Sequence, residues 1–429
     1  MRIAIIAIWL SILASGSHAA DWPQFLGPTR NGISSETNLC AAWPADGPPV
    51  VWQKKIGAGF SGPVVAGNRL ILFHRQNDKE IVECFDAKNG SPVWRFDYPT
   101  TYRDDFGFDE GPRATPTIAD GRVYTFGAEG ALHALDFQSG KKIWSVDTKQ
   151  TFHAPKGFFG MACSPLVEGD LVIMNLGGSD DAGIVAFDKK TGVVRWKKTG
   201  HEASYSSPVA ADINGTRYTL VFTRDGLTVL RPSNGDITFE FPWRSRMNAS
   251  VNAATPLVQD DLIFLSASYG TGAVLLRFRP STNPEGRRGA IVPTKVWSGD
   301  DILSDHYATS ILHDGYLYGI HGRTDPGFEP RPSLRCVELK TGKIRWSTEE
   351  IGPATLTFAD GQLLILTETG ELMRCAASPT QFKITSRAQI LGFGTRAFPA
   401  LANGLFYARS KDTLVCVRLR VGEPVSRKN

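Results

Sequence analysis

The chain has 429 residues, of which 21% are charged and 42% are hydrophobic, and its formal net charge is +4. This length and composition suffice for a large packed core and exclude a globally disordered chain. The small net charge, without a run of lysine and arginine, argues against a nucleic-acid partner.

The N-terminal residues are typical of a secretory signal. Arg2 precedes an apolar run over residues 3–13, and Ser17-His18-Ala19 places small residues where a signal peptidase cleaves. We predict a signal peptide over residues 1–19, with an uncleaved anchor as the alternative. The mature chain is expected to be exported, either to a periplasm or to the exterior. After signal cleavage we expect no integral membrane segment, because no second apolar stretch is long enough to span a bilayer.

A repeat with a period of about 50 residues then runs along the chain. In each clear copy a polar turn ending in Gly precedes a strand with Trp, and Trp94, Trp144 and Trp196 follow one another at intervals of 50 and 52 residues. Most copies also contain Asp-Gly or Asn-Gly between two alternating apolar runs, a strong signal for a type I′ hairpin. Each period therefore predicts four short antiparallel strands, which form one blade of a β-propeller.

Eight such units can be placed, and their innermost strands are predicted to begin near Gly62, Thr115, Ser164, Ser207, Thr255, Thr309, Ala354 and Phe398. The last unit lacks a Trp strand, whereas residues 49–56 form a Trp strand without a preceding unit. We predict an all-β, eight-bladed β-propeller with four-stranded antiparallel blades, in which the N-terminal strand closes the last blade and removes two open edges. Seven blades is the alternative. The expected organisation is an N-terminal extension over residues 20–49, a propeller over 50–420 and a tail over 421–429.

The tryptophans are predicted to pack between neighbouring blades rather than to bind a ligand. Four cysteines, Cys84, Cys336, Cys375 and Cys416, share one register on the third strand of their units. Equivalent points on adjacent blades are too far apart for a disulfide, so we expect buried free thiols there. The pairing of Cys40 and Cys163 stays open.

The phrase AFDKKTGVVRW, which ends at Trp196, resembles the PQQ-like (quinoprotein-type) β-propeller repeat, and the resemblance covers residues 50–419. That family includes PQQ- and calcium-dependent dehydrogenases and non-catalytic members such as an outer-membrane assembly lipoprotein. Residues 21–32 are similar to the opening of exported members that have no assigned activity. The resemblance makes PQQ and calcium candidate cofactors. However, the sequence has no adjacent cysteine pair and no Cys-x-x-Cys-His motif, and its first cysteine is Cys40.

The loops that lead into the innermost strands are expected to converge at one axial end of the channel. We predict that this polar face binds a ligand through Asp109, Arg113, His153, Tyr205, Asn252, His306 and Arg396, with no catalytic or metal-binding residue among them. Arg113 and Arg396 are favoured because each lies next to the start of an innermost strand. Residues 321–325, which follow the second strand of blade six, are expected to lie towards another loop layer.

These observations favour an exported, non-catalytic binding or scaffold propeller whose partner is a protein, a glycan or a small polar ligand. The alternative is a PQQ- and calcium-dependent dehydrogenase with an atypical site. A cofactor-free enzyme for a sugar-like substrate is a third hypothesis, based on the loop carboxylates. No Gly-x-Ser-x-Gly elbow, zinc pair or phosphate loop occurs in the sequence.

Overall fold

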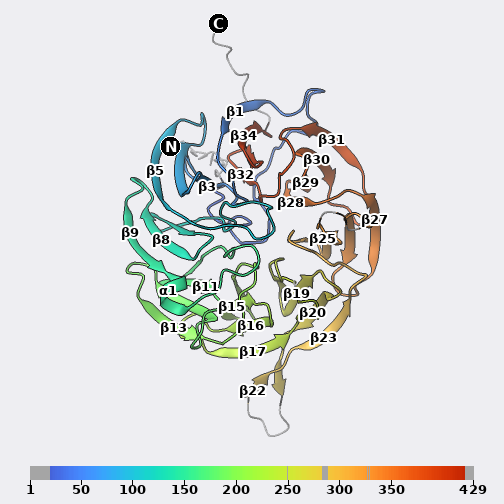
Figure 1. The fold of residues 1–429 in the computed structure, drawn as a ribbon. Coiled ribbons are helices and arrows are strands. Elements are labelled where there is room, and N and C mark those ends of the chain that lie inside the picture. Colours follow the sequence, from blue (N-terminus) through green and yellow to red (C-terminus); the bar gives the residue numbers. More distant parts are fainter. Residues whose placement is uncertain (1–19, 249, 283–287, 326, 328, 421–429) are drawn as a thin grey trace, which may run out of the picture.

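The computed structural model describes residues 20–248, 250–282, 288–325, 327 and 329–420. The predicted signal peptide and the C-terminal tail therefore lie outside the described residues. Within the described chain, eight four-stranded antiparallel sheets surround a central axis (Figure 1). This confirms the predicted eight-bladed propeller.

Blades one to seven each run from the innermost to the outermost strand in chain order. The strands of blades one to four are β2 (Val64–Ala66), β3 (Arg69–Gln76), β4 (Lys79–Asp86) and β5 (Pro92–Pro99); β6 (Thr117–Ala119), β7 (Arg122–Phe126), β8 (Ala131–Asp136) and β9 (Lys142–Asp147); β10 (Leu166–Glu168), β11 (Leu171–Asn175), β12 (Ile184–Asp188) and β13 (Val194–Lys198); and β14 (Val209–Ile213), β15 (Thr216–Phe222), β16 (Gly226–Leu230) and β17 (Ile237–Pro242).

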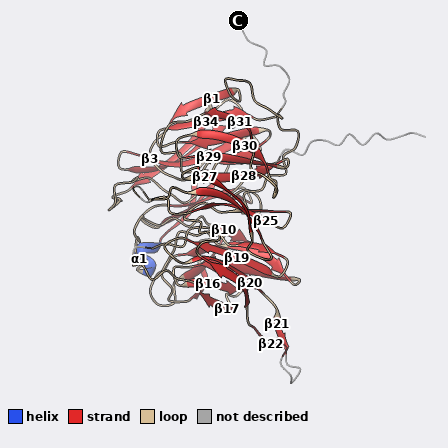
Figure 2. Ribbon diagram, turned by 90° about the vertical axis from the view of Figure 1, so that its right-hand side faces the viewer, coloured by secondary structure: helices blue, strands red, loops and turns tan. Residues whose placement is uncertain are grey.

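Blade five contains an inserted hairpin, β21 (Pro280–Thr282) and β22 (Arg288–Ile291), which projects away from the ring (Figures 1 and 2). The remaining strands of blades five to seven are β18 (Leu257–Gln259), β19 (Leu262–Ala267), β20 (Gly272–Arg277) and β23 (Thr294–Gly299); β24 (Ile311–His313), β25 (Tyr316–His321), β26 (Ser333–Glu338) and β27 (Ile344–Glu350); and β28 (Ala354–Ala359), β29 (Gln362–Thr367), β30 (Glu371–Ala376) and β31 (Ile384–Gln389).

Blade eight joins the two ends of the chain. Its strands β32 (Ala400–Ala402), β33 (Leu405–Arg409) and β34 (Thr413–Arg418) are followed on the outside by β1 (Val50–Lys55). The β1–β34 pair is antiparallel and sets Trp52 opposite Cys416. Figure 1 shows the blue β1 beside the red β34, so the predicted closure of the ring by the N-terminal strand is confirmed.

The predicted hairpin turns have the backbone that a type I′ turn requires. Asp120 and Gly121 have φ values of 48° and 72°, and Asn403 and Gly404 have 57° and 71°. Both central residues of such a turn need positive φ, which Asp, Asn and Gly tolerate better than other residues. Each turn therefore sends the second strand back towards the axial end at which the first strand began.

The hydrophobic core lies between neighbouring blades. Trp144 in β9 of blade two donates from its Nε1 to the carbonyl oxygen of Lys189 in blade three, at 3.1 Å, and its ring abuts Gly192. The other repeat tryptophans make the same kind of contact with the next blade. All six cysteines are free, and five of them are buried. The packing role of tryptophan and the free thiols in the shared register are confirmed.

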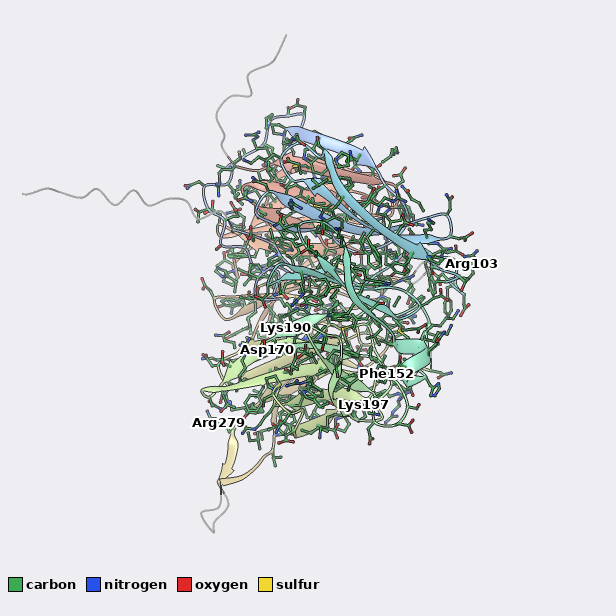
Figure 3. All side chains as sticks on the ribbon, turned by 90° about the vertical axis from the view of Figure 1, so that its left-hand side faces the viewer. Arg103, Phe152, Asp170, Lys190, Lys197 and Arg279 are labelled. Atoms are coloured by element: carbon green, nitrogen blue, oxygen red, sulfur yellow. The ribbon has the colours of Figure 1, made fainter. Side chains whose placement is uncertain are left out.

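The N-terminal segment, residues 20–40, crosses one axial face of the ring. Trp22 bridges to Val65 and Ile33 to Phe358, so the segment lies against the turns that follow the innermost strands. The short helix α1 (Thr148–Phe152) lies on the other side of the ring (Figure 2). In Figure 3, Arg103 marks that second face and Asp170 the first. Among the described residues, no helix has the length and apolarity needed to cross a membrane.

Candidate functional site

The loops that lead into the innermost strands enclose a cavity of about 170 Å³ at one axial end of the ring. Blades one to six and blade eight contribute to its wall. Much of the wall is aromatic, from Phe25, Phe60, Phe108, Phe159, Tyr205, Tyr307 and Phe398. The polar part consists of Arg113, Ser164, Ser207, His306, Thr324, Asp325 and Arg396. The structure therefore brings together four of the seven predicted site residues: Arg113, Tyr205, His306 and Arg396.

Thr324 and Asp325 also line the cavity, which corrects the expectation that residues 321–325 lie towards another loop layer. The reason is topological. Strand β25 pairs antiparallel with β24, so β25 ends at the axial end where β24 begins. A loop that follows the second strand of a blade therefore meets the loop that precedes the first strand.

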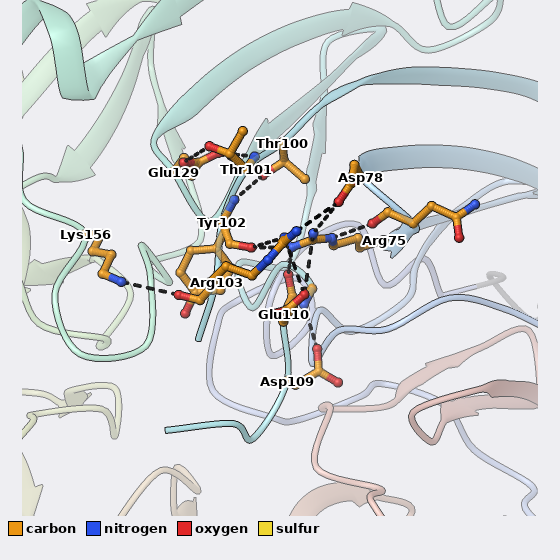
Figure 4. Close-up of polar contacts among 12 residues, drawn as sticks. Arg75, Asp78, Thr100, Thr101, Tyr102, Arg103, Asp109, Glu110, Glu129 and Lys156 are labelled. Carbon is orange, nitrogen blue, oxygen red and sulfur yellow. Dashed lines mark hydrogen bonds and ion pairs between the residues drawn. The ribbon is translucent and has the colours of Figure 1, made fainter. Parts of the chain in front are cut away.

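The loop before blade two, residues 100–113, is held by the buried Arg75 at the end of β3 (Figure 4). Its Nη1 donates to the carbonyl oxygens of Tyr102, at 2.7 Å, and Glu110, at 3.1 Å. Glu129 accepts hydrogen bonds from both Thr100 and Thr101. These contacts fix the loop that carries Arg113.

Arg113 forms an ion pair with Asp104, whose side chain is buried, with Nη2 and Oδ2 3.2 Å apart. Asp104 also accepts backbone N–H groups from Phe106, Phe108 and Asp109. Although burial opposes ionisation, the N–H groups of Asp109 and Phe106 and the Arg113 guanidinium hold the pKa of Asp104 below its ordinary value. The backbone N–H groups stabilise part of the negative charge of Asp104. The ion pair therefore neutralises the positive charge of Arg113 only in part, and the guanidinium can still attract an anion in the cavity.

Two aromatic rings flank Arg113. Its guanidinium carbon lies 5.4 Å from the ring centroid of Phe60 and 5.6 Å from that of Phe159. Cation–π contacts of this kind orient a guanidinium without using its N–H donors. Arg113 is therefore held in place while part of its hydrogen-bonding capacity remains for a ligand.

Arg396, in the loop before blade eight, has a matching environment. Its Nε donates to Glu368 Oε1 at 2.5 Å, and its guanidinium carbon lies 5.8 Å from the Phe108 ring and 5.9 Å from the Tyr307 ring. The rings of Phe108 and Phe159 are themselves 5.8 Å apart. Each arginine therefore contacts one ring of the Phe108–Phe159 pair, Arg113 that of Phe159 and Arg396 that of Phe108.

His306 has both ring nitrogens in hydrogen bonds. Its Nδ1 accepts the backbone N–H of Thr324 at 3.1 Å, and its Nε2 lies 2.6 Å from the hydroxyl of Tyr269. Burial lowers the pKa of His306, so the imidazole is neutral at physiological pH. With Nδ1 as an acceptor, Nε2 carries the proton and donates to Tyr269.

Tyr205 accepts the backbone N–H of Phe159 at 2.7 Å, and burial raises its pKa. The other three predicted residues lie outside the cavity wall. Asn252 donates to the carbonyl oxygens of Thr223 and Trp243, Asp109 accepts the N–H of Gly111, and His153 is the exposed C-cap residue of α1 with φ 53°. Their contacts support the loops around the cavity.

Phe25 is the lining residue that comes from outside the propeller repeats. The N-terminal segment brings its ring to 4.9 Å from that of Phe398, in an edge-on arrangement. Near it, the buried Arg30 donates to the carbonyl oxygens of Pro208, Ser164 and Pro165. The segment thus closes the channel from the opposite face. Phe25 was not among the predicted site residues, and its only signal in the sequence was the similarity of residues 21–32 to the opening of exported members of the family.

Calcium, which the sequence resemblance made a candidate, does not fit the residues of this cavity. Calcium takes six to eight oxygen ligands, carboxylates above all. Asp325 is the carboxylate of the cavity wall, and Arg323 already donates to its Oδ2 from Nε at 2.9 Å and Nη2 at 2.6 Å. Across the described ranges, no three His, Cys, Asp or Glu side chains gather as a metal site.

Comparison with known proteins gives two kinds of relative. The chain is 25% identical over 410 residues to the 1-butanol dehydrogenase (quinone) of Thauera butanivorans, covering 86% of this chain and 62% of that protein. It is 28% identical over 178 residues to quinoprotein alcohol dehydrogenase PedH of Pseudomonas putida, covering 39% of this chain and 28% of that protein. The chain thus spans less than two thirds of the length of either dehydrogenase.

Among solved structures, BamB from Moraxella catarrhalis has a TM-score of 0.61 at 17% identity, covering 88% of this chain and 99% of that one. Quinohemoprotein alcohol dehydrogenase from Comamonas testosteroni has a TM-score of 0.63 at 15% identity, covering 95% and 82%. At these identities the likeness concerns the fold alone. The family model described as outer membrane protein assembly factor BamB matches residues 78–348, more than half of the sequence. The chain therefore belongs to this family of PQQ-like β-propellers.

Proposed function

We propose that the protein is an exported binding propeller whose central cavity takes a flat, largely apolar ligand that carries a carboxylate or a similar anionic group. The observation that carries this proposal is the pairing of two arginines with a wall of aromatic rings. Aromatic walls favour planar apolar groups, and arginine favours carboxylates. Export rests on the predicted signal peptide; a chain cleaved after Ala19 keeps Phe25 and Arg30.

The state of the ionisable groups supports binding without a chemical step. A general base needs a free lone pair aimed at the substrate. His306 is neutral, but its Nδ1 lone pair is used by Thr324. Asp325 is held by Arg323, and each cavity arginine has a carboxylate partner. These groups are therefore suited to holding a ligand in place.

A PQQ-dependent dehydrogenase is the second candidate function. It is supported by the similarity to quinoprotein dehydrogenases, which extends over 86% of this chain for the Thauera butanivorans enzyme. PQQ is flat and carries carboxylates, so it also belongs to the ligand class proposed above. The residues of the cavity wall, however, do not fit the calcium ion that a PQQ- and calcium-dependent dehydrogenase needs. A protein partner, as in the assembly-factor branch of the family, is the outcome to pursue if no small ligand binds.

The test is calorimetric titration of the purified mature protein with 2-naphthoate, and separately with PQQ in the presence and absence of calcium. We expect saturable binding of 2-naphthoate that weakens at least about tenfold in Arg113→Met and in Arg396→Met, because each change removes a charge-assisted hydrogen bond. Arg279→Met is the matched control, since Arg279 is exposed and lies just before the blade-five insertion, away from the cavity.

Three results would count against the proposal. Failure of folded protein to bind either 2-naphthoate or PQQ would overturn the small-ligand function and favour a protein or glycan partner. Binding of PQQ only with calcium, followed by dye-linked alcohol oxidation, would replace the proposal with the dehydrogenase. Equal binding by the Arg113 variant and the Arg279 control would place the ligand elsewhere on the molecule.

A further inference from the structure

A second, smaller chamber of about 70 Å³ adjoins the central cavity. The two share Ala162, Tyr205 and Val251 as lining residues, so these three residues lie at the boundary between them. Its other walls come from the loop before blade three, residues 155–161, and from residues 202–204 before blade four. A substituent of a ligand in the central cavity would enter the chamber past these three shared residues.

Asn175, the last residue of β11, lines the chamber and is 2% exposed. Neither its Oδ1 nor its Nδ2 has a hydrogen-bond partner among the described residues. Buried polar side chains almost always have partners, and an amide without them is destabilising. An apolar residue at position 175 would avoid this cost. The presence of an amide there indicates a hydrogen-bond partner that the described part of the chain does not supply.

Arg224 forms another part of the same wall. Its Nη1 and Nη2 are engaged by Glu202 and by the carbonyl oxygen of Asn248, and its guanidinium lies 5.1 Å from the Phe158 ring centroid. Its Nε is buried and has no partner among the described residues. Glu202 balances the charge of Arg224, and Lys156, the other cation of the wall, forms an ion pair with Asp105 at 2.8 Å. The chamber therefore offers hydrogen bonds from a wall whose charges are paired.

We propose that this chamber recognises a secondary amide, such as an acylamino group, on the ligand whose flat anionic body occupies the central cavity. This inference rests on the proposed function. A secondary amide is a small neutral group that offers both an N–H and a C=O. Its N–H can donate to Asn175 Oδ1, and its C=O can accept from Asn175 Nδ2 or Arg224 Nε. The ligand class is therefore an N-acylated aromatic acid.

The experiment compares two probes, N-acetyl-L-tryptophan and indole-3-propionate, which share an indole ring and a carboxylate but differ in the acetamido group. We expect the wild-type protein to bind N-acetyl-L-tryptophan about tenfold more tightly. Asn175→Leu should abolish this difference, because it removes the amide partner, while the Kd of indole-3-propionate stays unchanged. Asn175→Ala serves as a second variant that adds no bulk to the chamber.

Thermal unfolding of the same variants separates recognition from a structural role. Replacing a partnerless buried amide by leucine of similar volume should leave the melting temperature unchanged or raise it. A large fall in both variants would instead assign Asn175 to the fold and overturn the inference. Equal wild-type affinity for the two probes would overturn it as well, while leaving the proposed function in place. If neither indole probe binds while 2-naphthoate does, the inference fails and the proposed function stands; if 2-naphthoate and PQQ also fail to bind, the proposed function itself fails.

Discussion

Asp305 and His306 are adjacent in the chain, and burial moves their protonation in opposite directions. Both are buried, and His306 lines the cavity. Burial disfavours the charged form of either group, so it lowers the pKa of His306 and raises that of Asp305 to about 8. The Asp305 carboxyl is thus largely protonated at neutral pH, with Ser310 as its side-chain partner at 2.6 Å. Two ionisable residues here act as neutral structural groups.

Asp305 should make the stability of the protein depend on pH. An unfolded Asp has a pKa of about 4. Between that value and about 8 the native state keeps a proton that the unfolded chain has lost. The contribution of this group is therefore complete below pH 4 and is lost as pH rises towards 8. We expect the free energy of unfolding of wild type, relative to Asp305→Asn, to fall by at least about 1 kcal/mol between pH 5 and pH 7. Urea denaturation at the two pH values measures this, and a constant difference would contradict the raised pKa.

At the scale of the elements, each blade is completed by its neighbour. The indole of Trp196 in β13 donates to the carbonyl oxygen of Pro232 in blade four, at 2.9 Å. Its ring packs on Gly235, where a Cβ atom would come within 2.7 Å of the indole. Gly235 has φ 72°, which glycine adopts readily. The repeated Gly and Trp are therefore the two halves of one contact between blades.

Trp196→Ala should lower the free energy of unfolding by about 3–5 kcal/mol, because it empties an interface between two blades. The matched control is Val193→Ala in the turn before the same strand; Val193 is 61% exposed. The control should change stability by no more than about 0.5 kcal/mol. Guanidinium denaturation compares them, and similar midpoints for the two variants would show that the tryptophan does not carry the interface.

At the scale of the whole molecule, the N-terminal segment ties several blades together. The Arg30 side chain contacts Thr117 in blade two, Ser164 and Pro165 at blade three and Pro208 at blade four. Burial lowers its pKa to about 9, which still leaves it charged at neutral pH. The same segment places Phe25 in the cavity wall. The integrity of the cavity thus depends on a segment that lies outside the repeats.

Arg30→Leu should destabilise the protein by about 3 kcal/mol, because it leaves buried carbonyl oxygens without donors. It should also weaken 2-naphthoate binding, since Phe25 lies five residues earlier in the same segment. Thr29→Ala is the control, because Thr29 is exposed beside Arg30. Differential scanning calorimetry measures the change in stability, and calorimetric titration measures the Kd of 2-naphthoate. If Arg30→Leu leaves both unchanged, Arg30 does not hold the N-terminal segment in place.

The architecture of the protein could be predicted from its amino-acid pattern. The Trp period, the Asp-Gly and Asn-Gly turns and the unpaired strands at the two ends were sufficient for eight blades and their closure, because these are local signals repeated at a fixed interval. The same register also predicted that the loops carrying Arg113, Tyr205, His306 and Arg396 would meet at one axial end. Repetition therefore predicts which loops are neighbours.

The directions of individual side chains, in contrast, depend on the three-dimensional fold and could not be predicted. Asn252 is turned to backbone carbonyl groups and His153 caps a helix, although their loops border the cavity. Phe25 enters the wall from a segment that has no repeat to give its register. A loop side chain takes its direction from contacts with residues far away in the chain, and a periodic pattern carries no information about those contacts.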